Sequence, residues 1–238
     1  MANLFPIVGI GASAGGLEAL KLFLSHVPVN SGMAFVIVQH LDPKRKGMLV
    51  EILQRNTPMP VEQVKDRTRV KPNCVYVIPP NKEMSILHGI LHLLEPVSAH
   101  GLRLPINYFF HSLAEDQNER SIGVILSGMG SDGSLGLRAI HEKAGLTCVQ
   151  EPQSAKFDGI PRSAIEDGLV DVVAAAEALP SRIIDSLLHP HMANKPGHVV
   201  ADEDHSGLEK WSFCCVRRRT AIFRCTKKRP CIAGSNGA

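Results

Sequence analysis

The chain has 238 residues, of which 44% are apolar and 21% are charged, and this is enough for one sizeable globular domain. The formal net charge of +3 is unevenly placed: residues 191–238 carry nine Lys and Arg against four Asp and Glu, whereas residues 1–190 carry 17 against 19. The nearly neutral body offers no basic surface for nucleic acid. No apolar stretch is long enough to span a bilayer and no basic-apolar leader begins the chain, so we expect a cytoplasmic protein without membrane insertion.

Apolar and β-branched runs alternate with segments of helical periodicity along residues 6–188, which is typical of a parallel sheet covered on both faces. We expect strands at 6–10, 34–38, 74–78, 121–126, 146–150 and 169–173. We expect helices at 17–27, 48–55, 106–114, 134–144, 161–166 and 179–188, the fourth of them ended by Gly145 as its C-cap. The predicted fold class is therefore α/β, with a doubly wound and mostly parallel sheet.

Two further features complete the predicted organisation. Residues 84–87 and 91–94 flank His88-Gly89, which indicates an antiparallel hairpin, and we expect it at one edge of the main sheet. The periodicity stops after Pro190, so we expect one domain over 1–190, followed over 191–238 by a linker and a disordered basic tail.

The cysteines give no sign of a metal site. Cys74 and Cys148 lie in strand-like runs, and isolated apolar cysteines of this kind are typical of a core. The four cysteines of the tail lack the paired spacing of zinc ligands. We expect no metal and no cofactor.

Three of the expected strands are closely followed by residue types that serve in hydrolases: Ser13 after the first, His40 after the second and Asp132 after the fourth. In an open parallel sheet, ligands bind beyond the carboxyl ends of the strands. These three residues can therefore converge on one crevice, and the pattern favours a hydrolase.

The turn around Ser13 matches two signatures. Residues 9–14 fit the dinucleotide fingerprint G-x-G-x-x-A, and residues 11–15 fit the nucleophile elbow G-x-S-x-G. A tight strand-to-helix turn with Ser13 as its N-cap explains the same residues structurally. A dinucleotide site usually has an acidic residue where the second strand ends, whereas here His40 follows, which is what a serine nucleophile needs as its general base.

The loop at 128–133, Gly-Met-Gly-Ser-Asp-Gly, is the most specific of the three segments. Three glycines in six residues permit positive φ angles and close backbone approach. Asp132 would suit either the N-cap of the following helix or a carboxylate that orients the imidazole of His40. The loop also offers backbone N–H groups near a helix start, which suit an oxyanion.

Taken together, these segments resemble the CheB-type catalytic domain of the chemotaxis protein-glutamate methylesterases, roughly over residues 6–188. The resemblance rests on motifs at 11–16 (GASAGG), 38–40 (VQH), 78–80 (IPP), 105 and 110–112 (P, FHS), 124–133 (VILSGMGSDG) and 157–162 (FDGIPR). It implies a serine hydrolase that removes methyl groups from glutamate γ-methyl esters of chemoreceptors in signal transduction and that also deamidates glutamines. It implies these roles: Ser13 as nucleophile, His40 as general base and then acid, Asp132 as the residue orienting the imidazole, Met129 as backbone oxyanion donor, and Ala14 and Gly130 beside it in the oxyanion or substrate-binding set.

The resemblance also indicates which partners to expect. Position 14 is Ala where many members have a hydroxyl residue, and members with this Ser-Ala-Gly-Gly turn often occur fused to receptor methyltransferase and sensor-kinase modules. We therefore expect methylated helices of chemoreceptors or related sensory proteins as partners, with sensor-kinase or methyltransferase components of the phosphorelay beside them. Read in a shifted frame, permitted codons for residues 222–238 encode a string resembling the start of the methyltransferase region, so we hypothesise a frameshift near Trp211.

Two alternatives remain at this point. One is a nucleotide-binding α/β module that uses the turn at 9–14 for phosphate. The other is a catalytically idle interaction module within a sensory signalling assembly.

Overall fold

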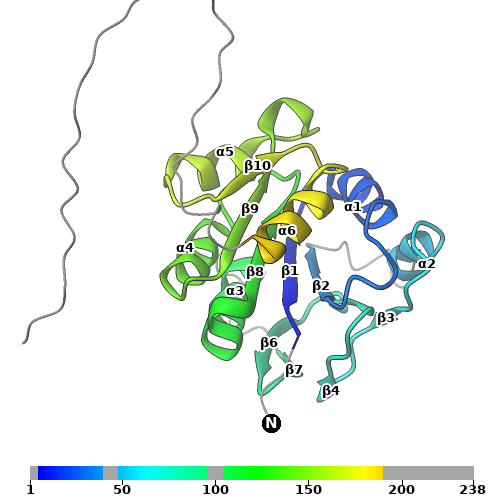
Figure 1. Cartoon of the computed structure of the whole chain (residues 1–238). Coiled ribbons are helices and arrows are strands. Elements are labelled where there is room, and N and C mark those ends of the chain that lie inside the picture. Colours follow the sequence, from blue (N-terminus) through cyan, green and yellow to red (C-terminus); the bar gives the residue numbers. More distant parts are fainter. Residues whose placement is uncertain (1–4, 40–47, 96–103, 190–238) are drawn as a thin grey trace, which may run out of the picture. The chain divides into compact units, whose positions relative to one another are not determined.

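The computed structural model describes residues 5–39, 48–95 and 104–189 (Figure 1). His40 and the predicted tail over 191–238 lie outside the described residues. Within the described part, no helix is both long and apolar enough to cross a membrane.

The main sheet has seven strands in the order β10-β9-β8-β1-β2-β5-β3, and every neighbouring pair is parallel. Its strands are β1 (Ile7–Ala12), β2 (Ala34–Gln39), β3 (Val61–Gln63), β5 (Val75–Val77), β8 (Ser121–Ile125), β9 (Leu146–Gln150) and β10 (Val172–Ala174). The apolar runs form these strands because both faces of a parallel sheet are buried. The predicted mostly parallel sheet is confirmed.

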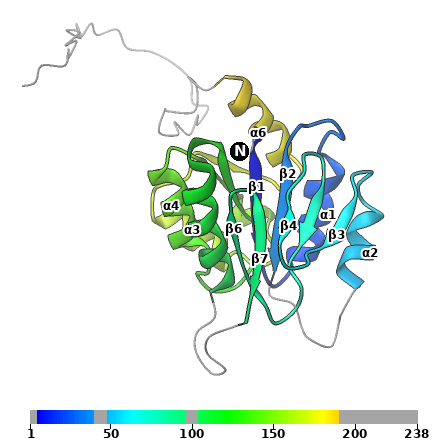
Figure 2. The same ribbon diagram turned by 90° about the horizontal axis from the view of Figure 1, so that it is seen from below.

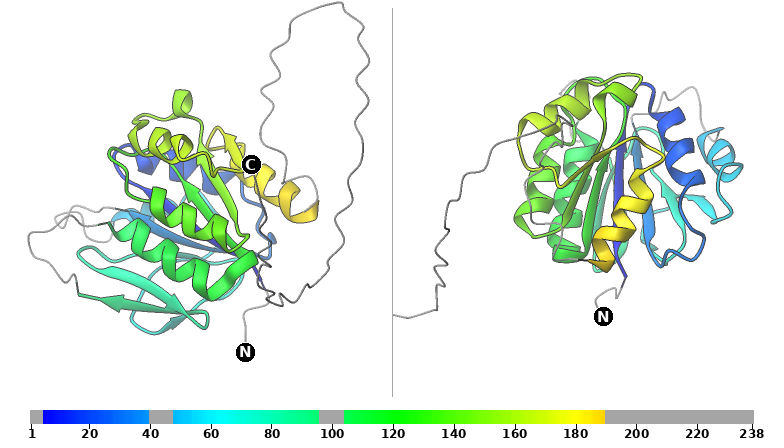
Figure 3. Two further views of the ribbon diagram at one scale, coloured as in Figure 1. Left: turned by 90° about the vertical axis from the view of Figure 1, so that its left-hand side faces the viewer. Right: turned by 45° about the horizontal axis from the view of Figure 1, so that its top comes forward.

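Helices cover both faces of this sheet (Figures 1 and 3). They are α1 (Gly16–Ser25), α2 (Met48–Gln54), α3 (Pro105–Gln117), α4 (Ser134–Glu142), α5 (Gly159–Glu166) and α6 (Leu179–Leu188). Apolar side chains of α1, α2 and α6 share one buried cluster, and those of α3, α4 and α5 share another on the opposite face. The chain is therefore doubly wound, as predicted.

The predicted antiparallel hairpin is present as β6 (Glu83–Leu87) and β7 (Ile90–Leu94), and His88 and Gly89 between them both have positive φ. Its predicted place at one edge of the main sheet was wrong, because neither strand pairs with that sheet. Together with β4 (Thr68–Arg69), which the sequence pattern did not reveal, it forms a separate three-stranded sheet. Figure 2 shows this small sheet beside α3, and its buried residues share the cluster of α3. It therefore covers a face of the main sheet where further helices would otherwise be needed.

Helix α3 lies close over the centre of the sheet because glycines leave room for it. A Cβ atom at Gly9 would lie 2.9 Å from side-chain atoms of Leu113 and Phe110, and one at Gly11 would lie 2.5 Å from Ile106. These two β1 glycines thus serve helix-to-sheet packing, which brings the amino end of α3 near the carboxyl end of β1.

The predicted end of α4 was wrong in one detail. Ala144, with φ of 59°, adopts the left-handed conformation after the helix, and Gly145 does not. A Cβ atom at Gly145 would lie 2.3 Å from Ser121 Oγ and 2.6 Å from Ser121 O. Position 145 therefore requires glycine because the chain passes close to the start of β8.

Candidate functional site

Strand order brings two of the three predicted segments together. Strands β8 and β2 flank β1 on its two sides, with Gly11 paired to Ile125 and Ala12 paired to Gln39. The turn containing Ser13 and the loop containing Asp132 therefore begin at neighbouring strand ends. Gln39, which directly precedes His40 in the chain, is the last described residue of β2.

Ser13 occupies a tight turn between β1 and α1. Its N–H donates to the Ser127 carbonyl at 3.0 Å, and its own carbonyl accepts from Gly16 N–H at 3.0 Å. Gly15 follows with φ of 71° and is the N-cap of α1, without any side-chain capping bond. The structural explanation of Ser13 as an N-cap is therefore wrong. The side chain is half-buried, and within the described residues its hydroxyl makes no hydrogen bond.

Ser127, two residues beyond the end of β8, links three loops through hydrogen bonds. Its Oγ lies 3.0 Å from the Ala14 carbonyl and 3.2 Å from the Phe157 carbonyl, and it accepts the Phe157 N–H at 3.0 Å. Its N–H donates to Gln150 Oε1 at 2.9 Å. The turn after β1 is thus fixed to the loops before α4 and α5. The sequence pattern did not reveal this role, although Ser127 lies inside the motif at 124–133.

The loop after Ser127 exposes backbone donors beside the serine turn. A Cβ atom at Gly128 would lie 3.0 Å from Ser13 Cβ, so the two segments are in direct contact. Met129 is 63% exposed, and Gly130 has φ of 93° with open space where a Cβ would lie. Within the described residues, the N–H groups of Ala14, Met129 and Gly130 donate to no protein acceptor. Donors of this kind are suited to a developing oxyanion.

Asp132 is buried at 5% exposure, and both of its carboxylate oxygens accept backbone N–H groups from the amino end of α3. Oδ2 accepts from Ile106 at 3.0 Å and Oδ1 from Asn107 at 3.0 Å. The N-cap of α4 is Gly133, with φ of 109° and no side-chain capping bond. The alternative of Asp132 as the N-cap of α4 is therefore wrong, because its carboxylate binds a different helix.

Asn107 is a further polar residue of this region that sequence reasoning missed. Its Oδ1 accepts N–H groups from Gly133 at 3.0 Å and Gly136 at 2.8 Å, and the residue is 7% exposed. It lies among apolar residues of α3, and no motif marks it. Only the approach of α3 to α4 reveals its contacts.

The charges around this edge are modest. Arg162 Nε donates to Asp158 Oδ2 at 2.5 Å, and this hydrogen bond lowers the pKa of the Asp158 carboxyl.

Burial raises the pKa of the Cys148 thiol far above its usual range, so this cysteine is an inert core residue as predicted. Among the described residues, no cluster of three or more His, Cys, Asp and Glu side chains could hold a metal ion.

Comparison with known proteins gives consistent matches. The family model of the CheB methylesterases matches residues 8–183. A Leptospira interrogans relative is 34% identical over 181 residues, which are 76% of this chain and 94% of the relative. A protein-glutamate methylesterase/protein-glutamine glutaminase of Salmonella typhimurium is 34% identical over 173 residues, which are 70% of this chain but 49% of that protein. The crystal structure of the Thermotoga maritima CheB methylesterase catalytic domain superposes with a TM-score of 0.72 at 28% identity, covering 77% of this chain and 99% of that one.

Proposed function

The chain belongs to the CheB methylesterase family, and from this premise we propose that it is a serine hydrolase acting on glutamate γ-methyl esters in methylated helices of chemoreceptors or related sensory proteins. Methanol is released and the γ-carboxylate is restored. Deamidation of glutamine side chains is part of the proposal because the Salmonella relative is named for both activities. Ester and amide differ only in the leaving group, so one acyl-transfer site serves both.

The proposed chemistry proceeds through an acyl-enzyme. Ser13 Oγ attacks the γ-carbonyl carbon while its proton passes to His40, and a tetrahedral oxyanion forms. The carbon–methoxy bond then breaks, and His40 returns the proton to the leaving oxygen as methanol departs. Water then attacks the acyl carbon while its proton passes to His40. His40 gives this proton to Ser13 Oγ as the Ser13 ester breaks, and the glutamate carboxylate is released. Asp132 orients the imidazole during both halves.

The observation that carries this proposal is the contact between the Ser13 turn and the loop after β8, at the carboxyl ends of neighbouring strands. The N–H groups of Ala14, Met129 and Gly130 that donate to no described acceptor lie in these same two segments. Each oxyanion donor typically lowers the barrier by about 2.7–4 kcal/mol. These donors, a half-buried serine and a buried carboxylate support acyl transfer.

The nucleotide-binding alternative finds less support. A pyrophosphate would approach the glycines of a dinucleotide turn closely. Here the space over Gly9 and Gly11 is occupied by side chains of α3. These two glycines are explained by packing, which leaves the serine as the distinctive residue of the turn.

The proposal is tested with the full chain and a chemoreceptor cytoplasmic fragment carrying radiolabelled methyl esters. Release of volatile methanol is measured for wild type, Ser13→Ala and the control Ser25→Ala. Ser25 lies exposed at the far end of α1, and within the described residues its hydroxyl bonds only to the Leu22 carbonyl and the neighbouring His26 ring. We expect Ser13→Ala to lower kcat by about 10³-fold or more, since the nucleophile is lost, and Ser25→Ala to match wild type.

A second measurement does not depend on the choice of substrate. A fluorophosphonate probe should label the wild-type chain at Ser13, as mapped by mass spectrometry of the tryptic peptide. Equal methanol release by wild type and Ser13→Ala, or labelling at another serine, would overturn the proposal. Labelling at Ser13 without methanol release would show that Ser13 is a nucleophile and that receptor methyl esters are not its substrate.

A further inference from the structure

Asn107 makes three hydrogen bonds that join α3 to the segment around Asp132. Its N–H donates to Asp132 Oδ1 at 3.0 Å, and its Oδ1 accepts from Gly133 at 3.0 Å and from Gly136 at 2.8 Å. One residue thus holds both the carboxylate of Asp132 and the main chain directly after it. The bonds to Asp132 and Gly133 close a ring, which restricts rotation of the carboxylate about its side-chain bonds.

The surroundings make this ring rigid. Asn107 and Asp132 are both nearly fully buried. A Cβ atom at Gly136 would lie 3.1 Å from Asn107 Cα and 2.5 Å from Phe110 Cβ, so α3 and α4 are in close contact here. If the Asn107 acceptor were removed, two buried N–H groups at the start of α4 would lose their partner, which is costly in a buried setting.

The amino end of α3 also suits an ionised carboxylate. Pro105 begins the helix and has no N–H, so Ile106 and Asn107 supply the first two donors, and both bind Asp132. The helix dipole of α3 favours negative charge at this end. The Asp132 carboxylate is therefore held by fixed main-chain donors, with its charge stabilised.

From these contacts we propose that Asn107 is a positioning residue, which fixes the Asp132 carboxylate in the orientation needed to steer the His40 imidazole. The inference rests on the proposed function, in which Asp132 has that task. Its effect belongs in kcat, because orientation of the general base matters in the transition state and not in substrate binding. Displacement of a catalytic group by about 1 Å can lower the rate by about 10²-fold.

The first test replaces the acceptor. Asn107→Leu keeps the size of the side chain and removes the oxygen, whereas Asn107→Ala leaves space in which water can satisfy Gly133 and Gly136. We expect each to lower kcat for methyl ester hydrolysis by about 10- to 100-fold, with KM within about twofold of wild type. If Asn107→Leu fails to fold, the kcat and KM of Asn107→Ala test the inference.

A matched control separates positioning from general destabilisation. Thr147 is fully buried at the start of β9, and its hydroxyl bridges the Leu169 carbonyl and Asp171, away from the strand ends of the site. Thr147→Val should lower the unfolding midpoint about as much as Asn107→Ala, because both remove buried hydrogen bonds. It should leave kcat unchanged.

The decisive measurement is a double-mutant cycle with Asp132→Asn. If Asn107 acts through Asp132, then Asn107→Ala should lower kcat by less than about threefold in the Asp132→Asn background. Equal losses in the two backgrounds would show a merely structural role and overturn the inference. Unchanged kcat in Asn107→Ala, with Ser13→Ala inactive, would overturn it as well and leave the proposed function intact, whereas an active Ser13→Ala removes the proposed function itself.

Discussion

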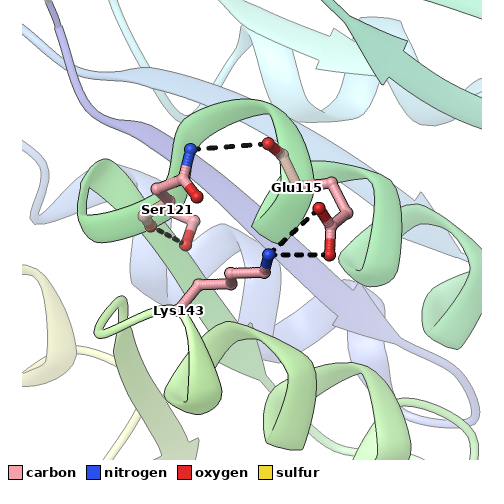
Figure 4. Close-up of polar contacts among 4 residues, drawn as sticks. Glu115, Ser121 and Lys143 are labelled. Atoms are coloured by element: carbon pink, nitrogen blue, oxygen red, sulfur yellow. Dashed lines mark hydrogen bonds and ion pairs between the residues drawn. The ribbon is translucent and has the colours of Figure 1, made fainter.

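Helices α3 and α4 are joined at both ends, but by different kinds of contact. At their amino ends, buried main-chain N–H groups bind Asp132 and Asn107. At their carboxyl ends, Lys143 pairs with Glu115 at 3.0 Å with both side chains partly exposed (Figure 4). Loss of a buried acceptor leaves donors unsatisfied, whereas water replaces a lost exposed partner. The amino ends are therefore the place where small changes should alter chemistry, and the carboxyl ends are a place where they should alter stability alone.

The largest effect is expected at the buried carboxylate. Asp132→Asn keeps the size of the side chain but presents one amide group to the two N–H donors of α3, and it removes the negative charge. If the proposed triad operates, kcat should fall by about 10⁴-fold, as in known Ser-His-Asp hydrolases. Steady-state methanol release measures the loss, with circular dichroism as a check of the fold. A loss below about tenfold would remove Asp132 from the proposed relay.

The second effect concerns the hydroxyl of Ser127. Ser127→Ala deprives the Phe157 N–H of its acceptor and the Ala14 carbonyl of its donor. The free energy of unfolding should fall by about 1–3 kcal/mol, and kcat by about tenfold because the Ser13 turn loses a tie to its neighbours. Denaturant titration and methanol release measure the two quantities. An unchanged kcat would show that the turn keeps its geometry without the Ser127 hydroxyl.

The arrangement of strand ends could be predicted because it follows from local patterns and one general rule. Apolar runs marked β1, β2 and β8, and ligands in parallel sheets bind beyond the carboxyl ends of strands. The end points of α6 at 179–188 were predicted correctly. The family and the methylesterase class that the motifs predicted are confirmed by the match over residues 8–183.

The remaining features depend on contacts between distant segments. Asn107 lies among apolar residues in the first half of α3, and its side-chain contacts arise only where α3 meets α4. The prediction of Asp132 as the cap of the following helix was wrong, because sequence proximity could not reveal α3 as the source of its donors. Its role toward His40 stays a prediction. Gly145 was read as a C-cap from its place after a helix, although its requirement comes from Ser121 across the fold.

The third effect lies at the carboxyl ends and is expected in stability alone. The buried Ser121 hydroxyl donates to the Asn118 carbonyl (Figure 4). The same carbonyl also accepts the Ser121 N–H. Ser121→Ala removes one bond while the carbonyl keeps another, so the free energy of unfolding should fall by about 0.5–1.5 kcal/mol. Denaturant titration measures this loss. A kcat below half of wild type would contradict the separation of the two ends.

The smallest effect is expected at the ion pair. Lys143→Met and Glu115→Gln each remove a partly exposed charge, and exposed pairs contribute about 0–1 kcal/mol because water and salt screen them. Each variant should lower the free energy of unfolding by less than about 1 kcal/mol, with a smaller difference in 1 M salt, and should leave kcat unchanged. Denaturant titrations at two salt concentrations check this. A salt-independent loss of several kcal/mol would mean that the ion pair holds α3 against α4. The carboxyl ends of these helices would then contribute to the placement of Asp132 as the amino ends do.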